Sequence, residues 1–131
     1  ALAKIKEAST DAFLLLTGAF GGRFDHAMST LFSCAFSGLP MILADDKEAC
    51  FFLHDGESLS FRAKQKPQAI SLFALGSECR GLSIEGVEWP LENASLCPEK
   101  PYAVSNELAE GSSAFHVRLQ AGTLAVYLYW Q

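Results

Sequence analysis

The sequence predicts a chain in two parts: an α/β remnant with a parallel, nucleotide-binding-type sheet, followed by an all-β sandwich. Up to residue 46, buried-type strands alternate with an amphipathic helix, as in parallel strands joined by a helical crossover. Beyond residue 46, short apolar runs recur about every ten residues between turn-forming residues, which is typical of a sandwich. We therefore expect residues 1–46 to be the C-terminal part of an α/β domain and residues 47–131 to form a β-sandwich domain.

Each expected element rests on a local pattern. Residues 1–7 resemble the end of a helix, and residues 13–17 and 41–44 are apolar enough for buried strands. Between them, apolar side chains recur at helical spacing from Phe24 to Phe36, and Gly38 and Pro40 end that helix. In the second part we expect strands over residues 49–54, 58–63, 69–75, 81–87, 102–105, 114–119 and 123–129, with hairpin turns at Asp55-Gly56 and Ala121-Gly122.

Composition argues against two classes of partner. The chain has 131 residues, 50% of them hydrophobic, and a formal net charge of -5. It can bury a core, but it offers no basic stripe for nucleic acid and no apolar run long enough for a membrane.

We expect a cytoplasmic protein with unpaired thiols rather than zinc ligands or disulfides, because the four cysteines are widely spaced and form no C-x-x-C pair. They are Cys34, Cys50, Cys79 and Cys97.

The most informative segment is Gly18-Ala19-Phe20-Gly21-Gly22-Arg23-Phe24-Asp25-His26, which joins the first strand to the helix. A glycine turn followed by a helix N-terminus presents backbone N–H groups that suit an anion such as a phosphate. Arg23 adds a positive charge, and Asp25 and His26 add a carboxylate and an imidazole. The pattern is neither a P-loop nor a dinucleotide fingerprint, and a Gly-Gly turn alone is more often only a turn.

This segment resembles the signature of the thiamine pyrophosphokinases, and further motifs follow in the family's order. They are Ile70-Ser71-Leu72, Gly86-Val87-Glu88-Trp89-Pro90-Leu91 and Val104-Ser105-Asn106-Glu107. The resemblance implies an enzyme that transfers pyrophosphate from ATP to thiamine, giving thiamine diphosphate and AMP, with Mg²⁺ accompanying ATP. It also implies a homodimer in which the sandwich of one subunit completes the thiamine site of the other.

By this resemblance, Asp25 and Arg23 are the catalytic residues. Arg23 would neutralise phosphate charge, while Asp25 would orient the thiamine hydroxyl, act as base or hold Mg²⁺ indirectly; we expect no other metal ligand in this chain. Gly21 and Gly22 would let a substrate approach the backbone, and His26 would orient Asp25 or touch the substrate. The structural alternatives are a salt bridge for Arg23, a helix-start carboxylate for Asp25 and a packed ring for His26.

Three further residues would bind thiamine in the sandwich part. Trp89 would stack on the cationic thiamine rings, and Ser105 and Asn106 would bind the edge of the aminopyrimidine. The structural alternatives are a core position for Trp89 and a β-turn for Ser105 and Asn106.

The chain departs from the family pattern in two places. The carboxylate segments of the family, Asp-Gly-Gly, Gly-Asp-x-Asp-Ser and Asp-x-Thr-Asp, do not occur in it, and Thr30 stands where the family has Asn. We therefore expect the later part of such an enzyme, inactive by itself. The alternative is a non-catalytic β-sandwich module that binds thiamine or has a regulatory role.

Overall fold

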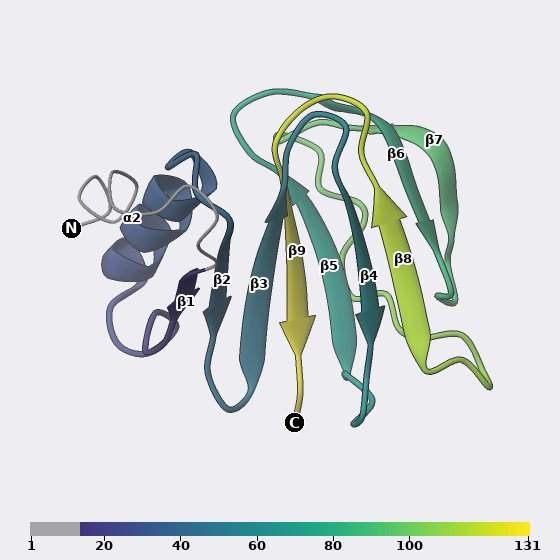
Figure 1. The fold of residues 1–131 in the computed structure, drawn as a ribbon, viewed down its shortest axis with the longest axis horizontal. Coiled ribbons are helices and arrows are strands. Elements are labelled where there is room, and N and C mark those ends of the chain that lie inside the picture. The colour runs from purple at the N-terminus through teal and green to yellow at the C-terminus, as the bar shows by residue number, and fades with distance from the viewer. Residues whose placement is uncertain (1–13) are drawn as a thin grey trace.

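Two sheets and one helix make up residues 14–131, the part of the chain that the computed structural model describes (Figure 1). The expected helix over residues 1–7 lies outside this part. The elements in chain order are β1 (Leu14–Leu16), α2 (Phe24–Ala35), β2 (Met41–Ala44), β3 (Glu48–Leu53), β4 (Ser58–Arg62), β5 (Ala69–Ala74), β6 (Cys79–Glu85), β7 (Leu91–Leu96), β8 (Ala114–Arg118) and β9 (Leu124–Tyr129).

The larger sheet has five strands in the order β1-β2-β3-β9-β5, and the smaller has four in the order β4-β8-β6-β7. β1 and β2 are parallel and are joined by α2, whereas all other neighbours are antiparallel. The fold is therefore mostly β, with two sheets and one helix. β2 pairs with β3 across residue 46, so one sheet continues through the expected domain boundary, and the division at that residue stays a prediction.

The pleat gives each strand of the five-stranded sheet two faces with different neighbours. In β9, Leu124, Val126 and Leu128 are fully buried in the core between the two sheets. Ala125 alternates with them and packs in a second core with α2. Burying one such aliphatic side chain contributes about 1.5–3 kcal/mol to stability. β9 therefore stabilises the packing of the smaller sheet on one of its faces and of α2 on the other.

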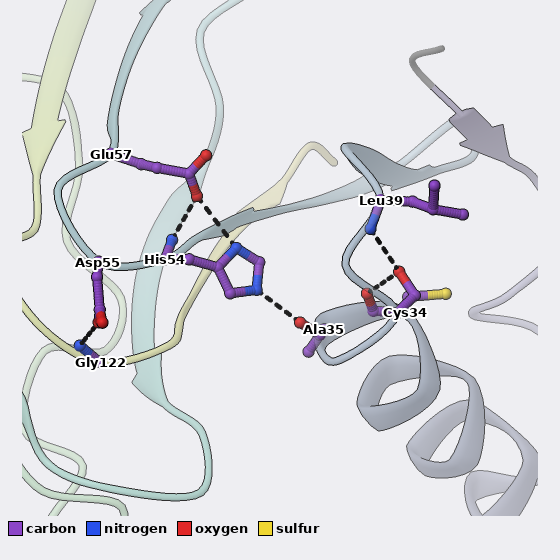
Figure 2. Close-up of polar contacts among 8 residues, drawn as sticks. Cys34, Ala35, Leu39, His54, Asp55, Glu57 and Gly122 are labelled. Carbon is purple, nitrogen blue, oxygen red and sulfur yellow. Dashed lines mark hydrogen bonds and ion pairs between the residues drawn. The ribbon is translucent and has the colours of Figure 1, made fainter. Parts of the chain in front are cut away.

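The C-terminal end of α2 is bound to the sheets by a histidine (Figure 2). His54 Nε2 donates a hydrogen bond to the carbonyl oxygen of Ala35 at 2.6 Å, and a carboxylate oxygen of Glu57 accepts from the His54 backbone N–H at 2.6 Å. The same oxygen lies 3.0 Å from His54 Nδ1. A carbonyl in the last turn of a helix has no partner within the helix, and the last turn of α2 carries no basic residue. The contacts of His54 are thus structural.

One expected strand is wrong and one strand was missed. Residues 102–105 form no strand, and β7 occupies Leu91–Leu96 instead. β7 is the edge of the four-stranded sheet and pairs with β6 through register shifts. Because most of its side chains are exposed or half-buried, its sequence lacks the apolar run that a strand buried on both faces would need.

The two turns expected to close hairpins instead carry the chain between the sheets. Asp55-Gly56 leads from β3 in the larger sheet to β4 in the smaller, and Ala121-Gly122 leads from β8 back to β9. The turns are joined, since the backbone N–H of Gly122 donates to a carboxylate oxygen of Asp55 at 2.6 Å (Figure 2). A turn sequence indicates a change of direction but not the sheet that the next strand enters.

Candidate functional site

The signature turn, residues 18–26, lies at the carboxyl end of β1 and leads directly into α2. Gly22 has a φ of +85°, a conformation that favours glycine. A side chain placed on Gly21 or Gly22 would meet no other atom within 4 Å. These glycines thus face open space, which leaves the turn accessible to a ligand.

Arg23 and Asp25 form an ion pair at this turn, with 2.6 Å between Nη2 and Oδ2. Their side chains are 76% and 58% exposed, so the pair contributes at most about 1 kcal/mol. The other carboxylate oxygen of Asp25 accepts from the backbone N–H of His26 at 2.9 Å. The salt bridge and the helix-start carboxylate, which were the structural alternatives for these two residues, are therefore both present. His26 is exposed, so the packed alternative for its ring is wrong.

Trp89, Ser105 and Asn106 lie together in a second place, as the sequence predicts. They line a pocket of about 360 Å³ beside β5 of the larger sheet and β6 and β7 of the smaller, which we call the tryptophan pocket. Its other lining residues are Leu72, Ile84, Leu91, Tyr102, Ala103 and Val104. Trp89 is 60% exposed and Tyr102 is 56% exposed. The core alternative for Trp89 is therefore wrong.

Asn106 holds Trp89 by its backbone. The side-chain oxygen of Asn106 accepts from the Trp89 N–H at 3.1 Å, and its amide nitrogen donates to the Trp89 carbonyl at 2.8 Å. The same oxygen also accepts from the N–H of Glu107 at 2.9 Å. The side-chain amide of Asn106 thus bonds both backbone polar groups of Trp89, as the backbone of a neighbouring strand would. These bonds direct the amide at the protein backbone.

Ser105 has a φ of +61°, which is unusual for a residue with a side chain. Its backbone N–H donates to the hydroxyl of Ser71 in β5 at 2.9 Å. The Ser105 side chain is exposed at the pocket and has no hydrogen-bond partner within residues 14–131. Of the two residues predicted to make polar contacts to a ligand, Ser105 is the one whose side chain is not already bound to the Trp89 backbone.

Sequence reasoning missed Tyr102 and Val104 as pocket walls. Val104 is 45% exposed, and the Tyr102 hydroxyl donates to the carbonyl of Ser95 in β7 at 2.8 Å. The available signal was the pair of large apolar residues just before the Ser-Asn-Glu segment. We interpreted that segment as a strand, which hid the exposure of both side chains.

The signature turn and the tryptophan pocket lie on opposite faces of the larger sheet. Ala19 and Phe20 of the turn pack in the core beside α2, and the Phe20 ring lies 6.2 Å from that of Tyr127 in β9. The pocket instead includes Leu72 and Ile84, which belong to the core between the two sheets. One copy of the chain therefore does not bring the two predicted parts of the site together.

An apolar groove of about 540 Å³ runs between α2 and the sheet, next to the signature turn. Phe24 of α2 lines it and is 77% exposed, so the expected apolar face of the helix is only partly covered. Burial, followed by the hydrogen bond to Glu48, raises the pKa of Tyr127 in its wall. Burial, followed by the charge of Cys34, raises the pKa of Cys50 to about 12. Both groups stay neutral at physiological pH, so neither acts there as an anionic nucleophile.

A model of the family "Thiamin pyrophosphokinase, vitamin B1 binding domain" matches residues 58–124, just over half of the chain. The matched range includes every wall of the tryptophan pocket. The chain belongs to the thiamin pyrophosphokinase family. It is also 30% identical over 105 residues to Thiamine pyrophosphokinase 1 of Oryza sativa subsp. japonica, an alignment that covers 77% of this chain and 39% of that protein.

Solved structures of thiamin pyrophosphokinases share the fold. That from Bacillus subtilis has a TM-score of 0.81 at 18% identity, over 99% of this chain and 61% of that one. The family protein from Enterococcus faecalis has a TM-score of 0.78 at 22% identity, over 100% and 62%. The enzyme from Candida albicans has a TM-score of 0.69 at 16% identity, over 97% and 49%. The chain thus spans less than two thirds of the length of these thiamin pyrophosphokinases.

Two further properties concern residues 14–131 alone. No helix among them is long and apolar enough to cross a membrane. No three side chains of His, Cys, Asp or Glu in this range lie together so as to hold a metal ion.

Proposed function

We propose that the protein is a thiamine diphosphokinase, which transfers the pyrophosphoryl group of ATP to the hydroxyethyl oxygen of thiamine. The observation that carries this proposal is the tryptophan pocket, an accessible aromatic hollow in a chain of the thiamin pyrophosphokinase family. The products are thiamine diphosphate and AMP.

The tryptophan pocket suits the chemistry of thiamine. Thiamine is a cation with two flat rings, and an aromatic face such as that of Trp89 attracts such a cation by on the order of 1–2 kcal/mol. A volume of about 360 Å³ lies in the range of small-molecule sites. The hydroxyl of Ser105 binds the aminopyrimidine edge, and Asn106 acts by fixing the backbone of Trp89.

The signature turn supplies the groups for the transfer. Gly21 and Gly22 admit the phosphates to the backbone, and Arg23 exchanges its ion pair with Asp25 for a phosphate oxygen. The released carboxylate of Asp25 then accepts the proton of the thiamine hydroxyl, while the backbone N–H of His26 holds its other oxygen. The hydroxyl oxygen forms a bond to the β-phosphorus, and the bond between that phosphorus and the oxygen it shares with the α-phosphorus breaks. AMP leaves with that oxygen, and the β- and γ-phosphoryl groups remain on thiamine.

We propose that two copies of the chain form the complete site. The placement of the signature turn and the tryptophan pocket on opposite faces of the larger sheet in one copy supports this arrangement. The pocket of one subunit then presents thiamine to the signature turn of the other. A positioned acceptor and donor are what this kind of transfer requires.

ATP and Mg²⁺ would be held mainly by carboxylates outside this chain. Residues 1–46 would be the C-terminal part of an α/β catalytic domain whose other carboxylate segments lie upstream. The described residues do not form a Mg²⁺ site by themselves, and Asp25 offers one carboxylate to it at most indirectly. We place the reaction in the cytoplasm, because the four cysteines are unpaired and three of them are buried.

The second candidate function is a thiamine-binding or regulatory module without chemistry. The completeness of the tryptophan pocket within one chain favours it. To decide between the two, we would titrate this chain with thiamine and measure thiamine-dependent AMP release from Mg-ATP, with this chain and with the full-length protein. AMP release by the full-length protein supports the kinase, and thiamine binding without any AMP release supports the module. Failure of both proteins to bind thiamine would exclude both functions.

A further inference from the structure

Ser71 is a buried polar residue to which the proposed function gives no role. It lies in β5 within the Ile70-Ser71-Leu72 motif, is 4% exposed, and is the only polar or charged residue among residues 14–131 that is this deeply buried. Its hydroxyl accepts the backbone N–H of Ser105 at 2.9 Å, across 34 positions of sequence. A serine in a strand core needs such a partner, because an unsatisfied hydroxyl there is costly.

The residue that Ser71 contacts is the strained one. Ser105 has a φ of +61°, a conformation that costs on the order of 1–3 kcal/mol and persists only where its surroundings impose it. The backbone on either side is held by β5 as well: Ile70 and Asn106 exchange hydrogen bonds at 2.7 and 2.8 Å, and Leu72 donates to Ala103 at 2.8 Å. The Ser71 hydroxyl adds a further hydrogen bond between β5 and this segment, at Ser105, whose backbone has the left-handed conformation.

The attachment extends to the aromatic wall of the pocket. Asn106 follows Ser105 directly, and its side-chain amide holds both backbone polar groups of Trp89. Glu88 adds a backbone bond to Glu107 at 2.8 Å. Two sets of hydrogen bonds, joined by the peptide bond between Ser105 and Asn106, therefore connect Ser71 to Trp89.

We propose that Ser71 is a positioning residue of the tryptophan pocket: it holds Ser105 in the left-handed conformation and thereby places Asn106 and Trp89 for ring recognition. Ser71 itself does not line the pocket and acts only through these residues. The identity of the ligand used below, thiamine, rests on the proposed function.

The first test compares the thiamine affinity of two Ser→Ala variants and one Ser→Thr variant. Ser71→Ala removes the acceptor, and Ser71→Thr keeps a hydroxyl. Ser37→Ala removes a half-buried hydroxyl that accepts from the N–H of Leu39, a residue of the core beside α2. We expect Ser71→Ala to weaken thiamine affinity about five-fold, the equivalent of one ordinary hydrogen bond. Titration calorimetry on folded protein should find wild-type affinity for Ser71→Thr and Ser37→Ala. An unchanged affinity in Ser71→Ala would overturn the proposal.

The second test asks whether the effect passes through the strain at Ser105. Glycine adopts a positive φ without support, so in a Ser105→Gly background the further loss caused by Ser71→Ala should shrink to less than about two-fold. An equal loss in both backgrounds would mean that Ser71 acts elsewhere. The comparison is internal to the Ser105→Gly background, so the loss of the Ser105 hydroxyl itself does not enter it.

A third measurement needs no ligand and separates this proposal from the proposed function. We would follow amide hydrogen exchange by NMR in wild type and Ser71→Ala. Faster exchange at both Ser105 and Trp89 supports the positioning role, whereas acceleration confined to Ser105 contradicts it. If wild type binds no thiamine, the proposed function fails, and this measurement still decides on Ser71.

Discussion

The signature turn and the tryptophan pocket are built in opposite ways. At the turn, Arg23 and Asp25 are exposed and bind mainly each other, and the glycines face open space. In the pocket, the amide of Asn106 is directed at Trp89 and Glu107, and the N–H of Ser105 is bound to Ser71. The difference suggests that groups meant to exchange partners are left loosely held, whereas groups that recognise a rigid ligand are fixed beforehand. Each prediction below tests one side of this contrast.

The largest effect is expected for Asp25→Asn at the turn. Loss of the proposed base should lower the rate of thiamine diphosphate formation by the full-length protein at least about 100-fold. The unfolding free energy should change by less than about 1 kcal/mol, because the ion pair with Arg23 is exposed. Steady-state AMP release and chemical denaturation measure the two quantities. Normal turnover would remove Asp25 from the site.

In the pocket, Asn106→Ala should instead lower stability. It removes three side-chain hydrogen bonds, each contributing about 0.5–1.5 kcal/mol, so we expect a loss of about 2–3 kcal/mol in urea denaturation. Asn106→Asp keeps the accepting oxygen and should lose less. If both variants unfolded like wild type, Trp89 would not depend on this amide.

Trp89→Ala should weaken thiamine binding about ten-fold, from the lost contact between the ring and the cation. Its effect on stability should be small, since the side chain is 60% exposed. Titration calorimetry gives the affinity, because it does not depend on the tryptophan fluorescence that the substitution removes. Trp130→Phe serves as the control, since it removes an indole that lies outside the pocket. A large loss of stability with unchanged affinity per folded molecule would assign Trp89 to packing.

Arg23→Ala should change stability as little as Asp25→Asn does, because both remove the same exposed ion pair. Loss of an exposed ion pair should change the unfolding free energy by less than about 1 kcal/mol. Thermal and urea unfolding of the variant beside wild type measure this change. A loss of several kcal/mol would show that the salt bridge pins the turn, which was the structural alternative for Arg23.

Local sequence patterns predicted most helices and strands, but they did not predict which sheet every strand joins. The periodicity from Phe24 to Phe36 matches α2, and residues 41–44 match β2, because both patterns reflect contacts close in sequence. β7 was missed, since an exposed edge strand has no distinctive apolar pattern. The expectation that Asp55-Gly56 closes a hairpin was wrong, since β3 and β4 lie in different sheets. The alternation of apolar and polar residues in a strand does not indicate which sheet the strand joins.

By itself, the sequence determined the glycine turn before α2, every strand except β7, and the motifs that gather at the tryptophan pocket. Tertiary structure alone decided the pairing of Ser71 with Ser105 and of Asn106 with Trp89, which are 34 and 17 positions apart. It also decided that the signature turn and the pocket occupy opposite faces of one sheet. The physical reason is that strand order depends on hydrogen bonds and burial between segments distant in sequence, whereas turns and helices depend on neighbouring residues.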